Sequence, residues 1–238
     1  MNNRSIFFVG DIQGCAQELK LLLQHAEFEP SRHRLVPVGD TINRGPDSPG
    51  VLRLLREMEA EPLLGNHERG LQNLDLDHPP VWALQPASAF MQLDAAGEWQ
   101  AALDWMREWP LVREGADWVA VHAGLHPFTS PQDLEPSYLT ELRWCDEAGH
   151  RPPKEKGASL EGPPGYRPWY EHYRGDRTVI FGHWARRGLV NLPRLRGLDT
   201  GCVYGRQLTG LWWPEDRLVQ VDALAAYARV KRPGAKST

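Results

Sequence analysis

The sequence predicts an α/β fold, and three observations support that class. Strand-like apolar runs alternate with helical periodicity in the first part of the chain, which is typical of a sheet with parallel strands. Each run ends in a glycine and a polar residue, so polar side chains are expected at one edge of the sheet. The length of 238 residues is sufficient to bury a core without disulfides.

The first elements follow from local apolar patterns. Apolar runs predict strands at residues 5–9, 35–38 and 63–64. Helices are expected at 18–26, where leucines recur at helical spacing, and at 51–58, which carries a broad apolar face. These segments give the order strand, polar turn, helix, and the sequence therefore predicts a parallel sheet with functional loops at the carboxyl ends of its strands.

The second half of the chain predicts further strands around a long loop. Apolar runs at 118–121 and 178–181 predict strands that end at histidines. Residues 146–177 are rich in Pro, Gly and charge, and we expect them to form a long irregular loop near the site. Two further runs, at 208–213 and 217–221, predict an antiparallel hairpin.

The domain organisation is expected to be simple. Residues 1–230 are predicted to form a single domain, and residues 231–238 a flexible basic tail. A helical insert is expected at 79–112, with its Trp-rich part at 84–110. Four tryptophans are expected to pack this insert onto the sheets: Trp82, Trp99, Trp105 and Trp109.

Charge and composition exclude several classes of protein. The 27 basic and 31 acidic residues give a net charge of −4, which argues against binding to a DNA duplex. The three cysteines have no CxxC spacing, so a reducing compartment is expected. The first apolar run is too short for a signal-peptide core, and no uncharged stretch is suited to a bilayer. We therefore expect a cytoplasmic protein without a membrane partner.

Polar residues at five predicted strand ends carry the chemical signal. Alone, each would be read as a cap or a structural histidine, but together they supply the oxygen and imidazole ligands of a two-metal hydrolytic site. Glycines beside them allow the chain to turn sharply off each strand. The residues are Asp11 with Gln13, Asp40, Asn66 with His67, His122, and His183.

The blocks that contain these residues resemble a known family. GDIQG (10–14), GDTINRG (39–45) and GNHE (65–68) are similar to the three ordered blocks of phosphoprotein-phosphatase-type, calcineurin-like metallophosphoesterases. VHAG (121–124) and FGHW (181–184) resemble the two later histidine blocks of the same family. FGHWA followed by LDTGCVYG (198–205) is most similar to the symmetrical diadenosine-tetraphosphate hydrolases. The resemblance implies a two-sheet β-sandwich flanked by helices, with the metal site at the carboxyl ends of the strands.

The resemblance also implies roles for individual residues. Two divalent ions are expected, with Mn²⁺ first and Co²⁺ or Mg²⁺ as alternatives. Asp11 and Gln13 would hold the first ion, and Asp40 would bridge both. His67 would be the general acid and Arg44 a phosphate ligand. The ligands implied for the second ion are Asn66, which would also stabilise charge on the substrate, His122 and His183.

Two positions depart from the family pattern. Gln13 stands where a metal-ligating histidine is usual, and an amide oxygen is a weaker ligand than imidazole. Asn43 replaces the aspartate that orients the catalytic histidine in protein phosphatases. Its oxygen is able to accept an imidazole N–H, but it brings no negative charge. The second departure speaks against a protein Ser/Thr phosphatase.

Substrate contacts are predicted from arginine and aromatic residues near these blocks. Arg143, Arg186 and Arg187 are candidate phosphate ligands. Trp169, in the long loop, either stacks on a nucleobase or anchors the loop on the core, and Trp144 and Trp184 are placed where a base platform is also possible.

The expected activity is symmetrical cleavage of diadenosine tetraphosphate to two ADP by a hydroxide bridging the metals. The expected partner is a dinucleoside polyphosphate, with capped RNA 5′ ends as a variant of the same chemistry. A metal-dependent phosphatase of phosphoproteins or small phosphoesters is an alternative, and a nucleotide sensor with a degenerate metal site is another. The chain is expected to be a monomer or weak dimer.

Overall fold

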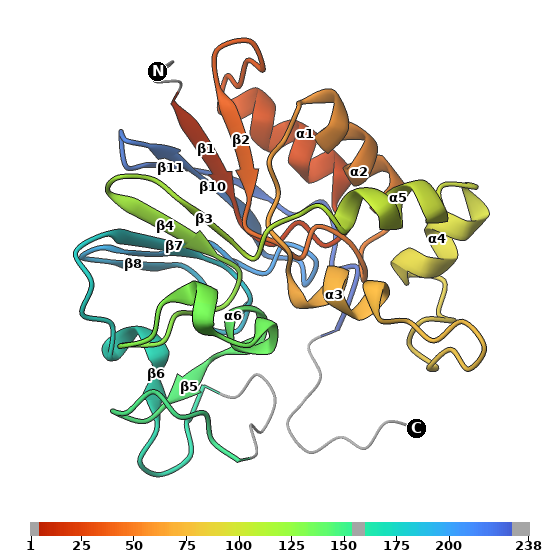
Figure 1. The fold of residues 1–238 in the computed structure, drawn as a ribbon. Helices are drawn as coiled ribbons and strands as arrows, with labels where there is room; N and C mark the ends of the chain where they lie inside the picture. Colours follow the sequence, from red (N-terminus) through yellow and green to blue (C-terminus); the bar gives the residue numbers. More distant parts are fainter. Residues whose placement is uncertain (1–4, 154–159, 230–238) are drawn as a thin grey trace.

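Two β-sheets with helices on their outer sides form the structure, a computed structural model that describes residues 5–153 and 160–229 (Figure 1). The first sheet has the order β11-β10-β1-β2 and the second β3-β4-β7-β9-β8. The first sheet consists of β1 (Ile6–Val9), β2 (Arg34–Pro37), β10 (Gln207–Trp213) and β11 (Arg217–Asp222). The second consists of β3 (Val112–Glu114), β4 (Trp118–Val121), β7 (Thr178–Phe181), β8 (Val190–Leu192) and β9 (Leu195–Gly197).

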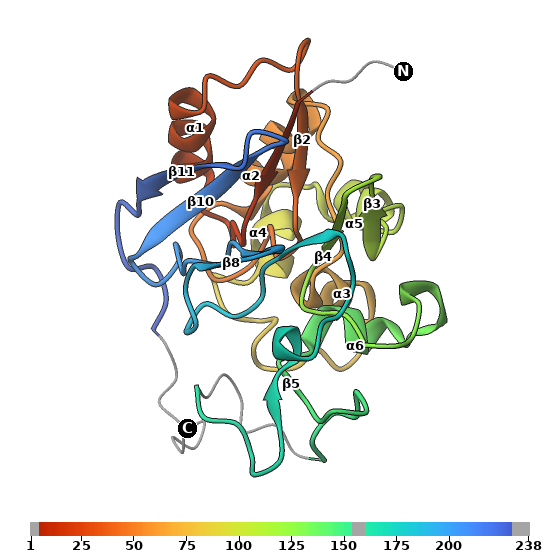
Figure 2. The same cartoon turned by 90° about the vertical axis from the view of Figure 1, so that its left-hand side faces the viewer.

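Six α-helices are present in the described ranges. They are α1 (Ala16–His25), α2 (Ser48–Glu57), α3 (Asn66–Gln72), α4 (Ala89–Ala95), α5 (Trp99–Met106) and α6 (Pro136–Glu141). The first two lie within a few residues of the helices predicted at 18–26 and 51–58. Helix α1 packs across the outer face of the first sheet beside β10 and β11 (Figure 2). Within the described part of the chain, no helix is long and apolar enough to cross a bilayer.

The parallel sheet expected from the strand–helix alternation describes only part of the strand pairing. Strand β1 pairs in parallel with β2 but antiparallel with β10. The strands β4, β7 and β9 run in parallel in the other sheet. The predicted hairpin is confirmed, because β10 and β11 pair antiparallel. Local periodicity identifies a strand, but it does not say which distant strand it will pair with, and only the family resemblance implied two sheets.

Each central strand is apolar on both faces because each faces a core on both sides. In β1, Phe7 and Val9 pack against α1 and α2, whereas Ile6 and Phe8 lie in the core between the two sheets. This division follows from the alternation of side chains along a strand. The core between the sheets also contains Trp118 and Ala120 of β4, so the sheets are layers of one β-sandwich.

Three local predictions need correction. Residues 63–64 form no strand, although the N–H of Leu63 donates to the carbonyl of Pro37 at 3.0 Å and the segment runs beside β2. The insert packs on α2 and α3 rather than on the sheets, and Trp109 lies in that helical cluster. Trp82 is 43% exposed and packs little.

The region 146–177 is less irregular than expected. It contains β6 (Arg167–Pro168), which pairs with β5 (Trp144–Cys145), and a 3₁₀ turn at Trp169–Glu171. A second 3₁₀ turn, Pro131–Asp133, precedes α6. Residues 154–159 of the loop and the expected basic tail, 231–238, lie outside the described residues.

The two sheets approach closely beside Gly10, at the end of β1. A Cβ added at Gly10 would lie 2.2 Å from the carbonyl oxygen of Leu198, which follows β9. We predict that Gly10→Ala lowers the free energy of unfolding by about 1–3 kcal/mol, because the backbone of the second sheet must move away. The matched control is Gly70→Ala in α3, where the nearest atom is 4.0 Å away.

The control should leave stability unchanged or raise it by up to about 1 kcal/mol, because alanine favours a helix over glycine. Urea unfolding of both variants measures the difference. Equal stability of the two variants would contradict the close approach of the sheets.

Candidate metal centre

The carboxyl ends of strands from both sheets meet at one edge and bring the predicted ligands together. Asp11 and Gln13 follow β1, and Asp40 follows β2. Asn66 begins α3, after the segment beside β2. His122 and His183 come directly after β4 and β7 of the second sheet. One ligand atom from each of Asp40, His122 and His183 lies within 4.8 Å of the others.

Asp40 is the centre of this group and is 2% exposed. Its Oδ1 accepts the backbone N–H of His67 at 2.9 Å and lies 3.3 Å from Nε2 of His122. Its Oδ2 accepts from Nε2 of Gln13 at 3.4 Å and lies 3.6 Å from Nε2 of His67. Burial acts to raise the pKa of Asp40, but the nearby imidazoles, the His67 N–H and Arg44 together lower it, so the carboxylate is ionised.

The two ligand-candidate imidazoles are oriented by backbone carbonyls. Nδ1 of His122 lies 2.9 Å from the carbonyl oxygen of Val38, and Nε2 of His183 lies 3.1 Å from that of Glu141. Because a carbonyl oxygen only accepts hydrogen bonds, each of these nitrogens carries the proton. In the neutral ring the other nitrogen then offers a lone pair to the site, as in many metal-bound histidines. Burial, Arg143 and His122 lower the pKa of His183, which favours its neutral form.

In these tautomers of the neutral rings, the second ring nitrogens of His122 and His183 face the Asn66 oxygen without a proton to share. Oδ1 of Asn66 lies 3.1 Å from Nε2 of His122 and 2.8 Å from Nδ1 of His183. A carboxamide that served only to satisfy two neutral imidazoles would present its NH₂ group, whereas here it presents its oxygen. Acceptors that face one another in a buried site are stabilised by a cation, so the donor set fits a divalent metal ion.

Asp11 provides a second indication of missing positive charge. Its Oδ1 accepts the backbone N–H of His183 at 3.0 Å, but its buried Oδ2 has no hydrogen-bond partner in the described structure. Burial and the neighbouring carboxylates of Asp199 and Asp40 raise its pKa well above the usual value. A metal ion at this position would remove that penalty.

Asp199 was not predicted as a site residue. It is 4% exposed, and burial together with Asp40 raises its pKa to about 6. Its position in LDTGCVYG, shortly after FGHW, was the only signal in the sequence that could have indicated it.

The backbone is unusual at these positions. Positive φ values occur at Gln13 (48°), Asp40 (50°), Asn43 (71°), Arg44 (66°) and His183 (71°). Side chains other than glycine rarely adopt this conformation, and such strain concentrates at functional sites. The surrounding hydrogen bonds therefore hold these residues in place.

Glu68 accepts one of those bonds, from Asp40, and also holds the neighbouring turn, although it was not singled out from the sequence. Its buried carboxylate accepts from the N–H groups of Asp40 (3.0 Å), Thr41 (2.7 Å) and Gly65 (2.9 Å), and from the Thr41 hydroxyl (2.9 Å). It thus joins the turn after β2 to the start of α3. The two segments that carry Asp40 and Asn66 are fixed to each other through this one side chain.

A backbone carbonyl, rather than Asn43, holds the ring of His67. Its Nδ1 donates to the carbonyl of Ile42 at 3.0 Å, whereas the side-chain oxygen of Asn43 accepts the N–H of Ala89 at 2.6 Å. Asn43 therefore does not orient the imidazole, because its oxygen accepts the N–H of the first residue of α4. Burial, opposed by Asp40, lowers the pKa of His67 to about 4.

The predicted arginines lie in different settings. The Arg44 guanidinium is exposed, lies 5.8 Å from the centre of the Tyr204 ring and lowers the pKa of Asp40. Arg143 lies near enough to His183 to lower its pKa. Arg187 lies over Tyr170 and lines a cavity of about 670 Å³. Arg186 is half-buried.

Trp169 does not fit a stacking role. It is 1% exposed and packs on Phe181 and Gly124 in the core of the second sheet. Trp144 and Trp184 are also buried, with their rings 4.9 Å apart. The alternative prediction for Trp169, an anchor that holds the loop on the core, agrees with this burial.

A comparison with protein-family models identifies the family of this chain. The model of the calcineurin-like phosphoesterases matches residues 4–187, which include the ligand candidates from Asp11 to His183. The chain belongs to the calcineurin-like phosphoesterase family. Membership confirms the fold implied by the sequence blocks, and it implies divalent metal ions for this phosphoesterase.

Relatives of this phosphoesterase share most of its length. A protein of Coxiella burnetii named symmetrical bis(5′-nucleosyl)-tetraphosphatase is 31% identical, with 87% of this chain and 88% of that protein aligned. One of the same name from Aromatoleum aromaticum is 30% identical over 92% of this chain and 97% of its own length.

Solved structures agree on the fold. A candidate diadenosine tetraphosphatase superposes with a TM-score of 0.75 at 31% identity, covering 94% of this chain and 96% of its own. A cold-active protein tyrosine phosphatase of a psychrophilic Shewanella reaches 0.55 at 15% identity, covering 92% and 80%, and shares the fold alone.

The role of Glu68 leads to a test. We predict that Glu68→Gln lowers the free energy of unfolding by about 2–4 kcal/mol, because an amide NH₂ would face backbone donors in a buried site. Mn²⁺ affinity, measured by calorimetry, should fall as well, since Asp40 and Asn66 lose their common support. The control is Glu98→Gln, which removes a largely exposed ion pair with Arg53 and should change neither quantity measurably. Unchanged Mn²⁺ affinity in Glu68→Gln would refute the positioning role.

Proposed function

We propose that this phosphoesterase hydrolyses dinucleoside tetraphosphates symmetrically, giving two ADP from diadenosine tetraphosphate. The observation that carries the proposal is the convergence of carboxylate, amide and imidazole acceptors at one strand edge, in a chain about 30% identical over most of its length to proteins named symmetrical bis(5′-nucleosyl)-tetraphosphatase. The convergence of acceptors supports metal-dependent phosphoester chemistry, and the identity to these relatives supports the substrate class.

Two divalent ions would be held by residues of this chain, with Mn²⁺ proposed first because the ligand set mixes oxygen and imidazole. Asp11 and Gln13 would hold one ion, and Asp40 would contribute to both. When bound, the ions supply Lewis acidity for the phosphoryl oxygens and a water nucleophile that is reactive near neutral pH. The remaining ligands are Asn66, His122 and His183.

His67 is proposed to deliver a proton to the leaving phosphate oxygen from Nε2. The bond from Nδ1 to the Ile42 carbonyl fixes the ring so that Nε2 faces the site. A pKa of about 4 keeps the ring neutral in the free protein near pH 7. The negative phosphates of a bound substrate favour the protonated ring, so the acid forms when substrate is present.

Arginines are proposed to bind the polyphosphate chain. Arg44 extends from a strained turn beside the site, where its guanidinium matches the geometry of a phosphate. Arg143, Arg186 and Arg187 are candidates for the outer phosphates. Arg187, Arg167 and His172 line a cavity of about 670 Å³, which is proposed to take an outer part of the substrate.

Product analysis tests the proposed reaction directly. Diadenosine tetraphosphate incubated with protein and Mn²⁺ should give ADP as the only nucleotide product, because attack at an inner phosphate releases a nucleoside diphosphate. Chelation of the metal should stop the reaction. AMP plus ATP as products would overturn symmetrical cleavage, and efficient release of phosphate from phosphopeptides instead would favour a protein phosphatase.

The acid role of His67 has a separate test. His67→Ala should lower kcat by about 10²–10⁴-fold while metal content stays at the wild-type value, because His67 is not among the proposed ligands. His78→Ala changes an exposed histidine and serves as the control with unchanged kcat. A His67→Ala protein with wild-type turnover would remove this residue as the acid.

A further inference from the structure

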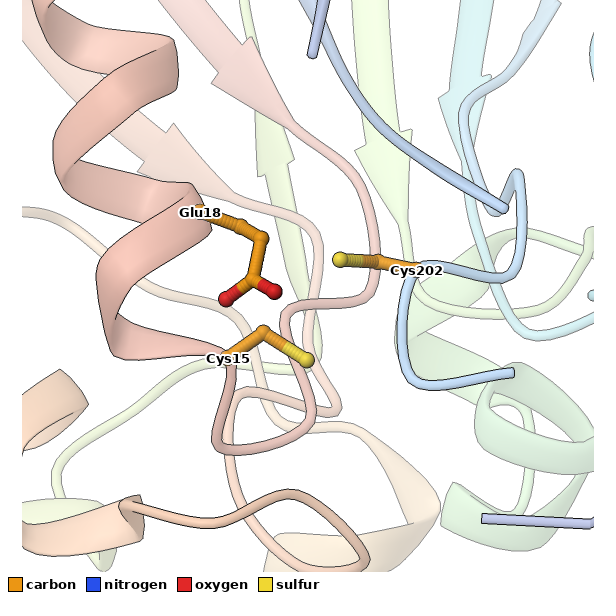
Figure 3. A group of neighbouring side chains, drawn as sticks. All are labelled: Cys15, Glu18 and Cys202. Carbon is orange, nitrogen blue, oxygen red and sulfur yellow. The ribbon is translucent and has the colours of Figure 1, made fainter. Parts of the chain in front are cut away.

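Three buried side chains outside the proposed phosphoesterase site converge behind the turn that carries Gln13. Figure 3 shows Cys15, Glu18 and Cys202, with Glu18 on α1 and Cys202 on the loop that follows Asp199. Their ligand atoms, two Sγ and one carboxylate oxygen, all lie within 4.8 Å of one another. All three residues are at most 1% exposed.

Glu18 is the unexplained member of this cluster. Its Oε1 accepts from the N–H of Leu224 at 3.0 Å and from the hydroxyl of Tyr227 at 2.8 Å. Its Oε2 is buried and has no hydrogen-bond partner in the described structure. A carboxylate oxygen left in this state costs free energy unless a proton or a cation occupies the space beside it.

The neighbouring thiols do not satisfy that oxygen. Sγ of Cys15 donates instead to the carbonyl of Gln13 at 3.9 Å. No ion pair of Glu18 occurs in the part of the chain that the structure describes, so no basic side chain supplies the charge. The Glu18 carboxylate, one oxygen of which has no partner, and the two sulfurs therefore share one buried space that suits a cation.

The ligand types select the class of cation. Thiolate sulfur prefers Zn²⁺ and other soft ions, whereas Mg²⁺ and Mn²⁺ prefer oxygen. Tetrahedral Zn²⁺ with Zn–S bonds of about 2.3 Å holds two sulfurs about 3.8 Å apart, so the observed spacing needs only small side-chain adjustments. The proposed phosphoesterase site offers oxygen and nitrogen donors and no sulfur, so cysteine ligation distinguishes the two sites.

We propose that Cys15, Glu18 and Cys202 bind one thiophilic divalent cation of the Zn²⁺ class. Binding displaces one proton from each thiol to solvent and leaves two thiolates and one carboxylate around the ion. The bound ion links the start of α1 to the loop that carries Asp199, and through Glu18 to the segment of Leu224 and Tyr227. It would therefore stabilise the loop that carries Asp199, whose carboxylate lies close to that of Asp11.

Cd²⁺ titration of the reduced, metal-free protein tests this site without any substrate. Sulfur-to-metal charge transfer in the ultraviolet reports only cysteine ligands, and the proposed phosphoesterase site has none. One equivalent of Cd²⁺ per chain should produce the band in the wild type and in Cys145→Ser, which changes a buried cysteine outside the cluster. Cys202→Ser should lose the band.

Zn²⁺ should also raise Tm in the wild type and in Cys145→Ser by several degrees more than in Cys202→Ser, because a ligand that binds only the folded state stabilises it. Glu18→Gln, which keeps both thiols, should bind Cd²⁺ at least tenfold more weakly. A wild type without the band, or a Cys202→Ser protein that retains it, would overturn the proposal. Neither outcome bears on hydrolysis of dinucleoside tetraphosphates.

Discussion

The mutual repulsion of buried acceptor atoms at the strand edge is the constraint on which the rest of this structure depends. Asp40, Asn66, His122 and His183 present oxygens and nitrogen lone pairs to one another at 2.8–3.3 Å. Such an arrangement is unfavourable in a protein interior without positive charge. The surrounding fold must therefore hold these groups in place until divalent ions balance them.

The seam between the two sheets supplies that support. The Val38 carbonyl at the end of β2, in one sheet, fixes the ring of His122, which follows β4 in the other. The carboxylate of Asp11, after β1, accepts the N–H of His183, after β7. Each sheet thus orients ligand candidates of the other, and the close contact at Gly10 keeps them in register. Moving one sheet relative to the other would separate the whole group.

The sequence predicted the strand ends well because glycine and an acidic or amide residue after an apolar run is a local signal. It did not predict the two sheets from periodicity, since β1 pairs with β10 about 200 residues away. The hydrogen bonds of Glu68 and the bond from Ala89 to the Asn43 oxygen could not be predicted, because they join residues that are neighbours only in the folded chain. Trp169 was ambiguous because a tryptophan in a polar loop gives no information on its burial.

Anomalous diffraction from crystals grown with Mn²⁺ tests the central claim most directly. Two anomalous peaks per chain are expected, both in contact with the Asp40 carboxylate, one of them also with Asp11 and the other with Asn66, His122 and His183. The hydrogen bonds from His122 to Val38 and from His183 to Glu141 should persist in the loaded protein. Absence of both peaks, or peaks that do not touch Asp40, would contradict the central claim.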